Sequence, residues 1–243
     1  FGLHAADNLR AASSSLARAF TDAEPQILSE FPQVLCIVGG APLSDDIDPP
    51  LKSVECYNPA TRAWHSLPDL THRRDYAAVC VRGGSIYACG GQTLRPQYLC
   101  SVECLALSGN PLVWERSSPM MHVVENGEGE DEEDEEDKER LRIRIAGSAV
   151  CALNGRIYVC GGASDEGLQD DVYCFDPVAK KWESVACMRE SRGGASAVAY
   201  RGKIYVIGGI DEDGAMINAV DCYDPDRDRW MKVARLPTPR RDV

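Results

Sequence analysis

The sequence of 243 residues lacks the features of several large protein classes. No apolar run approaches the ~20 residues that cross a bilayer, and no signal peptide is visible, so we expect no membrane protein. Only four histidines occur, without metal-ligand spacing, and there is no Walker loop, G-x-S-x-G elbow or G-x-G-x-x-G motif. These absences predict a protein that is not an enzyme and has no metal site and no cofactor.

The cysteines also lack the pattern of a secreted scaffold. There are eleven, none in a C-x-x-C pair, and the chain has no N-x-Ser/Thr glycosylation sequon. Many free thiols predict a reducing compartment, the cytoplasm or also the nucleus. Most of the cysteines recur at equivalent positions of a repeat, which favours packing as small apolar side chains. Redox sensing is the alternative, with Cys100 and Cys187 as its candidates.

Most of the net negative charge comes from one segment. The formal net charge is −12, of which residues 125–139 contribute −10 through eleven acids and one lysine. The rest of the chain is nearly neutral and has no basic face, so we expect no nucleic-acid partner. Residues 125–139 are predicted to be a disordered acidic insertion. It is either a solvated loop, a segment that covers a basic mouth of the same chain, or a patch for a basic partner.

A repeat of about fifty residues dominates the sequence. Four Gly-Gly pairs that follow apolar runs are spaced 51, 71 and 47 residues apart, and the acidic segment lies in the longest interval. Each pair is followed by a Val-x-Cys segment and then by a tryptophan; these are Trp64, Trp114, Trp182 and Trp230. Short strands with turn signals such as Asn154-Gly155, and no helical periodicity, predict an all-β protein. The period predicts a β-propeller whose blades have four strands each.

The third repeat illustrates the expected blade. Its strands a, b and c are predicted at residues 147–153, 156–160 and 171–175, with strand d around Trp182. A polar loop is expected over residues 162–170, between strands b and c.

The last two repeats resemble the kelch repeat. The third contains Ile157-Tyr158-Val159-Cys160-Gly161-Gly162 and Cys174-Phe175-Asp176-Pro177 before Trp182, and the fourth matches equally well. The resemblance covers about residues 34–243 and suggests the BTB-BACK-kelch family. It implies blades over residues 31–243, four of them visible. Because Arg240-Arg241-Asp242 matches the residues ahead of an earlier strand a, a further repeat is expected to begin there, and the ring is expected to be incomplete in this chain.

Residues 1–30 have a different pattern. Leu3, Leu9, Leu16 and Phe20 have helical spacing, and Thr21 with Glu24 could form a capping box. We expect a short helical segment, which the resemblance interprets as the end of a preceding BACK-like domain. Because the chain opens at Phe1, an upstream segment is expected.

The long loops predict where a partner binds. In an antiparallel blade the b–c and d–a loops share one face, and here they are long, polar and varied. An arginine precedes each strand a; these are Arg74, Arg144, Arg192 and Arg241. If they converge at the channel mouth, their guanidiniums suit an acidic protein or peptide, and resembling proteins bind acidic degrons this way. The alternative is that they hold loop carbonyls.

The resemblance implies a protein-interaction module. We expect the substrate-recognition part of a BTB-kelch adaptor for a cullin-type E3 ubiquitin ligase, with the cullin bound through a domain outside this chain. The alternative is a cytoskeletal or scaffolding kelch protein that binds actin or another structural partner. Kelch-fold oxidases hold copper with Tyr, His and Cys, but the sequence has no such set.

Overall fold

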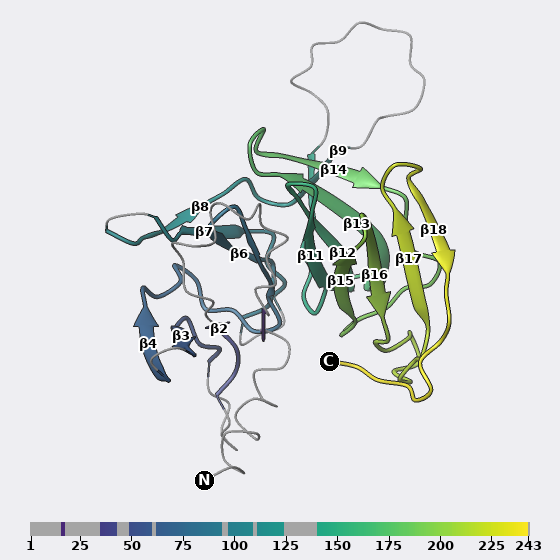
Figure 1. Ribbon diagram of the computed structural model, residues 1–243, viewed down its shortest axis with the longest axis horizontal. Coiled ribbons are helices and arrows are strands. Elements are labelled where there is room, and N and C mark those ends of the chain that lie inside the picture. Colours follow the sequence, from purple (N-terminus) through teal and green to yellow (C-terminus); the bar gives the residue numbers. More distant parts are fainter. Residues whose placement is uncertain are drawn as a thin grey trace, which may run out of the picture.

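The computed structural model describes residues 16–17, 35–42, 49–59, 62–93, 97–108, 111–123 and 140–242. Within these ranges the regular elements are all β-strands. They form four four-stranded antiparallel sheets and one separate two-stranded sheet. Figure 1 shows the four sheets following one another in chain order, as the blades of a propeller do. The described part of the chain offers no helix with the length and apolar character needed to cross a bilayer.

Each blade is built from consecutive strands. Blade I contains β1 (Leu16–Ala17), β2 (Leu35–Val38), β3 (Val54–Asn58) and β4 (Ala63–Leu67). Blade II contains β5 (Ala78–Arg82), β6 (Ser85–Cys89), β7 (Val102–Ala106) and β8 (Trp114–Arg116). Blade III contains β11 (Ala149–Leu153), β12 (Arg156–Ser164), β13 (Gly167–Asp176) and β14 (Lys181–Val185). Blade IV contains β15 (Ser196–Tyr200), β16 (Lys203–Ile207), β17 (Val220–Asp224) and β18 (Arg229–Lys232). The all-β prediction with four visible blades is thereby confirmed.

Blade III differs from the prediction between its middle strands. The expected polar loop over residues 162–170 is instead part of a long hairpin, in which Gly162 pairs with Gln169 and Ser164 with Gly167. The register shifts between Cys160 and Gly162, which marks a β-bulge. The sequence did not predict this extension of the hairpin, because its side chains are mostly polar. A hairpin that projects beyond the core does not need alternating apolar residues.

The N-terminal segment differs from the helical prediction at two residues. Leu16 and Ala17 form β1, which pairs antiparallel with β2 through Leu16 and Ile37. Helical spacing is a local signal, whereas β1 satisfies the exposed hydrogen-bonding edge of β2. The other residues of the predicted helical segment, and the acidic segment at 125–139, lie outside the described residues.

The hydrophobic core lies between neighbouring blades. One buried cluster joins blades I and II and includes Val38, Ile86 and Trp114. A second joins blades II and III around Cys89 and Phe175, and a third joins blades III and IV. Each blade is therefore stabilised by its neighbours, and the arrangement positions the loops on a rigid support.

The repeated tryptophans connect adjacent blades. The indole Nε1 of Trp114 donates to the Pro68 carbonyl at 2.8 Å, that of Trp182 to Ser118 at 3.1 Å, and that of Trp230 to Ala186 at 2.7 Å. In every case the acceptor follows strand d of the preceding blade. Trp64 of blade I, by contrast, is 49% exposed. The tryptophan of the repeat thus has two functions, filling the space between blades and tying them together.

Candidate partner-binding face

The second glycine of each Gly-Gly pair donates its N–H to a backbone carbonyl in the following d–a loop, and the residues that accept these bonds occupy equivalent positions in the repeat. The Gly40 N–H donates to the Arg74 carbonyl at 2.8 Å, and three corresponding bonds reach Ile145, Arg192 and Arg240. Arg144 and Arg241 therefore lie one residue away from the position that Arg74 and Arg192 occupy. In extended backbone a shift of one residue reverses the side on which a side chain lies. The four predicted arginines fall into two different groups for this reason.

Arg74 is a fully buried structural residue. Its Nε and Nη2 both donate to Glu103 Oε1, at 3.1 and 2.8 Å, and its Nη1 donates to the Gly90 and Ser101 carbonyls. Glu103 is itself buried and accepts the Thr71 N–H at 2.6 Å. Burial raises the pKa of Glu103, but the bonds from Arg74 and Thr71 outweigh it and keep that pKa below its usual 4.5.

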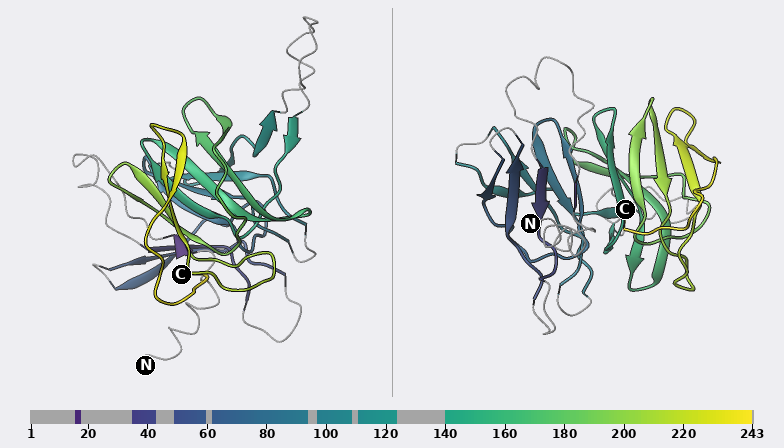
Figure 2. Two further views of the ribbon diagram at one scale, coloured as in Figure 1. Left: turned by 90° about the vertical axis from the view of Figure 1, so that its right-hand side faces the viewer. Right: turned by 60° about the horizontal axis from the view of Figure 1, so that its bottom comes forward.

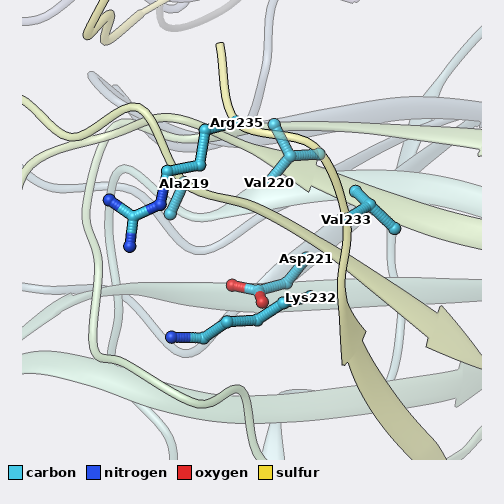
Figure 3. A pocket seen from close by; sticks show the side chains of 6 residues that line it. All are labelled: Ala219, Val220, Asp221, Lys232, Val233 and Arg235. Atoms are coloured by element: carbon cyan, nitrogen blue, oxygen red, sulfur yellow. The ribbon is translucent and has the colours of Figure 1, made fainter.

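Arg192 occupies the same place in blade IV with poorer partners. Its Nη2 donates to Asp221 Oδ2 at 2.5 Å, and both side chains are buried. Arg192 Nε and Asp221 Oδ1 find no hydrogen-bond partner among the described residues. A small hollow lies beside them, lined by Asp221, Lys232 and Arg235 with three small apolar residues. Figure 3 shows the Asp221 carboxylate between the Lys232 and Arg235 side chains.

Blade III has no such ion pair. Ile145 takes the place of the arginine, and Tyr173 takes the place of the acid on strand c; both are buried in the cluster between blades II and III. The buried pair is thus one of two solutions that the repeat uses at this position.

The expectation of four arginines converging on one exposed mouth is therefore corrected. Arg74 and Arg192 are 0% exposed. They donate to backbone carbonyls, as the alternative interpretation expected, and also to acids on strand c, which it did not include. Arg144 and Arg241 are exposed, and Arg241 lies 3.5 Å from the neighbouring Asp242 carboxylate. That these two contact a partner stays a prediction.

A chain of backbone hydrogen bonds runs around the inner edge of the propeller. The Gly147 N–H donates to Tyr76, Gly194 to Gly147, and Asp242 to Gly194, at 2.9, 2.9 and 2.8 Å. All four residues have φ between 51° and 65°, in the left-handed region that glycine adopts most readily. Asp242 continues the series, which supports its equivalence to the earlier residues.

The side chains at this inner edge include an aromatic hydroxyl and two carboxylates. Tyr76 is 41% exposed, and burial together with the charges of Asp75 and Asp242 raises the pKa of its hydroxyl. Burial also raises the pKa of both Asp75 and Asp242. An aromatic hydroxyl flanked by two carboxylates was not predicted, because the sequence signal, a repeated arginine, pointed to a basic mouth.

The loops of blade IV add an acidic and apolar part to the same face. Glu212 and Asp213 are exposed in its b–c loop, and Met216 is 57% exposed. Ser191 of the preceding d–a loop donates to Glu212 Oε1 at 2.9 Å, which holds the two loops together. The loop face therefore offers both signs of charge.

Blade III carries a group of three possible metal ligands, formed by Asp170, Asp171 and Cys187. The Cys187 thiol contacts Asp171 Oδ1 at 3.8 Å. Burial and the two carboxylates raise the pKa of Cys187, which disfavours the thiolate that metal binding requires. We assign no metal to this group.

The acidic segment emerges from a separate hairpin. β9 (Met121–Val123) pairs with β10 (Arg140–Arg142), with Arg142 opposite Met121. Figure 2 shows this hairpin standing out from the blades. Arg140 and Arg142 are therefore both in extended backbone.

Known proteins that are similar in sequence to this chain contain kelch repeats, in agreement with the four-bladed architecture. The profile described as the KLHDC2/KLHL20/DRC7 Kelch-repeats domain matches residues 28–242. Kelch repeat and BTB domain-containing protein 12 of Danio rerio is 30% identical over 210 residues, which is 77% of this chain and 30% of that protein. Kelch-like protein 35 of Mus musculus is 25% identical, over 89% of this chain and 33% of its own length.

One further relative and one solved structure of similar fold broaden the comparison. Alpha-scruin of Limulus polyphemus is 26% identical over 79% of this chain and 20% of that protein. The solved structure described as "Structure of YjhT" has a TM-score of 0.58 at 17% identity, covering 75% of this chain and 52% of its own. The chain spans about a third or less of the length of these curated relatives.

Proposed function

The chain belongs to the kelch-repeat β-propeller family, and from this we propose that it recognises a protein partner with the face formed by its b–c and d–a loops. The proposal is based on the difference between buried side chains that stabilise the blades and exposed side chains on the loop face. Arg74, Glu103, Arg192 and Asp221 are buried and bonded within their blades, whereas the loop face leaves Tyr76, Arg144, Met216 and Arg241 exposed. A rigid scaffold that displays varied loops is suited to recognition.

We further propose that this recognition serves a cullin-type E3 ubiquitin ligase, with a BTB domain elsewhere in the protein binding the cullin. Similarity to the Danio rerio protein, whose name includes a BTB domain, supports this. The eleven free cysteines support a cytoplasmic or nuclear location. The mixed charge around Arg241 and Asp242 suits a partner segment that carries both charges, in place of the purely acidic one expected from the arginines.

A second candidate is a cytoskeletal or scaffolding kelch protein without a ligase. The similarity to alpha-scruin, whose name includes no BTB domain, favours keeping it. The two candidates share the binding face and differ in what else the whole protein recruits.

Affinity purification of the full-length protein from cells, with the proteasome and neddylation inhibited, tests the assignment of the binding face and distinguishes the ligase adaptor from the scaffold. A loop-face variant combines Arg144→Ala, Met216→Ser and Arg241→Ala. The matched control is Val178→Ser, because Val178 is 80% exposed in a c–d turn on the opposite face. The proposal expects a cullin with every variant and a partner lost only with the loop-face variant. Structural partners without a cullin would favour the scaffold, and a partner lost only in the control would refute the assignment of the face.

A further inference from the structure

Cys36 and Cys56 lie directly opposite each other on β2 and β3 of blade I. Three residues further along the same ladder, the Gly39 N–H donates to the Ser53 carbonyl at 3.0 Å. Hydrogen-bonded and non-hydrogen-bonded pairs alternate in antiparallel sheets, so Cys36 and Cys56 form a non-hydrogen-bonded pair. Such pairs have Cα atoms about 4.5 Å apart, within the range of roughly 4.4–6.8 Å that disulfides span.

The other three blades have a different pair at this position. Tyr87 faces Cys104, Tyr158 faces Cys174, and Tyr205 faces Cys222. In each the facing cysteine contributes to raising the pKa of the tyrosine hydroxyl. In blade I the same position pairs two thiols, Cys36 and Cys56, and Cys56 helps to raise the pKa of Cys36. A contact that is chemically inert in blades II to IV therefore places two oxidisable sulfurs side by side.

We propose that Cys36 and Cys56 form a reversible disulfide when a low-molecular-weight disulfide, such as oxidised glutathione, is the oxidant. The Cys56 thiolate attacks one sulfur of the oxidant, forms a mixed disulfide and releases one glutathione thiol. The Cys36 thiol then loses its proton, attacks the Cys56 sulfur and releases the second glutathione. The protein loses two electrons and two protons, and the oxidant becomes two thiols.

Exposure sets the order of the two steps. Cys56 is partly exposed, whereas Cys36 is 3% exposed and packs against blade II. Burial and the neighbouring Cys56 raise the pKa of Cys36 to about 12, which makes Cys36 a poor first nucleophile. Its position directly opposite Cys56 is what lets Cys36 act as the resolving thiol once Cys56 is modified. The cross-link would fix the base of the b–c loop of blade I, because β2 and β3 flank that loop.

Tryptic mapping of the 243-residue chain after equilibration in glutathione buffers tests the proposal. Cleavage after Lys52 separates the two cysteines, so only a disulfide keeps residues 19–52 attached to residues 53–62. We expect this linked pair of peptides to accumulate as the buffer becomes more oxidising and to disappear on reduction. Cys104→Ser, at the equivalent position of blade II, is the matched control and should leave the linked pair unchanged.

Two single variants separate the steps. Cys36→Ser should leave glutathione trapped on Cys56, whereas Cys56→Ser should leave Cys36 unmodified. The native chain decides the question even if a variant fails to fold. Cys36 and Cys56 recovered as separate peptides across the whole buffer series, each alkylated or glutathionylated, would overturn the proposal. Linkage of either residue to another cysteine would also overturn it.

Discussion

Arg74 and Glu103 form a buried ion pair in which two guanidinium nitrogens share one carboxylate oxygen, at 3.1 and 2.8 Å. Both side chains are 0% exposed. Two further donors of Arg74 reach backbone carbonyls of the same blade, so the pair connects the d–a loop, strand b and strand c. A buried charge pair is stable only when its remaining donors and acceptors are also satisfied, and this one meets that condition.

Removing one partner should destabilise the fold strongly. Glu103→Ala leaves the Arg74 charge buried without a counterion, so we expect the free energy of unfolding to fall by about 3–5 kcal/mol. Urea denaturation measures this. The matched control is Glu183→Ala, which removes the surface pair with Arg156, whose side chains are 41% and 56% exposed; a loss below about 1 kcal/mol is expected there. Equal losses would contradict the structural role of Arg74.

A substitution beside the Arg192–Asp221 pair of blade IV should increase the stability of the fold. Ser101 Oγ accepts Arg74 Nη2 at 2.9 Å, whereas the equivalent residue in blade IV is Ala219. Ala219→Ser supplies a hydroxyl beside Arg192, so we expect stabilisation of about 0.5–1.5 kcal/mol. The reciprocal Ser101→Ala in blade II should destabilise by about 1–3 kcal/mol, because it removes an acceptor from a buried charge. If Ala219→Ser were destabilising in urea denaturation, the hollow would be too small for the hydroxyl.

The repeat made most of the fold predictable. Gly-Gly pairs, Val-x-Cys segments and tryptophans recur because each blade meets the same packing and turn constraints, and these are local in sequence. The hairpin between Gly162 and Gln169 was missed because it projects beyond the core and has no apolar pattern. The pairing of β1 with β2 was missed because it joins segments that are distant along the chain.

The candidate site was less predictable than the fold. The sequence placed an arginine ahead of blades II, III and IV and another after blade IV, but the distinction between buried Arg192 and exposed Arg144 depends on a shift of one residue in extended backbone. Only the hydrogen bond from the second glycine of each pair shows that shift. The acids on strand c, Glu103 and Asp221, were visible as residues but had no sequence signal linking them to arginines about thirty positions earlier.

Stability should depend on pH in opposite directions at two carboxyls. The pKa of Glu103 is held below 4.5 by Arg74 and Thr71 despite burial, so its stabilising contribution is present above about pH 4.5 and is lost as pH falls through the folded value. Burial raises the pKa of Asp75 from 3.8, although the Tyr76 N–H opposes it, so the charged form of Asp75 costs stability at neutral pH.

Denaturation of Glu103→Gln and Asp75→Asn at a series of values from about pH 3 to about pH 7 tests both directions of pH dependence. This range includes the unperturbed pKa values of the two carboxyls. Glu103→Gln should flatten the loss of stability on the acid side. Asp75→Asn should raise stability at pH 7 and lose this advantage as the pH falls, since Asn keeps the acceptor for Tyr76. The same sign of change in both variants at pH 7 would contradict the assignment.

The indole N–H of a repeat tryptophan should contribute to the free energy of unfolding only where the preceding blade supplies a carbonyl that accepts its hydrogen bond. Trp230→Phe removes the bond to Ala186 at 2.7 Å and leaves a carbonyl unpaired between blades III and IV, so we expect destabilisation of about 1–3 kcal/mol. Trp64→Phe is the matched control, because Trp64 is 49% exposed, and a change within about 0.5 kcal/mol is expected. Tryptophan fluorescence cannot report both variants equally, so urea denaturation followed by far-ultraviolet circular dichroism is the measurement. A large effect of Trp64→Phe would show that blade I packs against a further element through that indole.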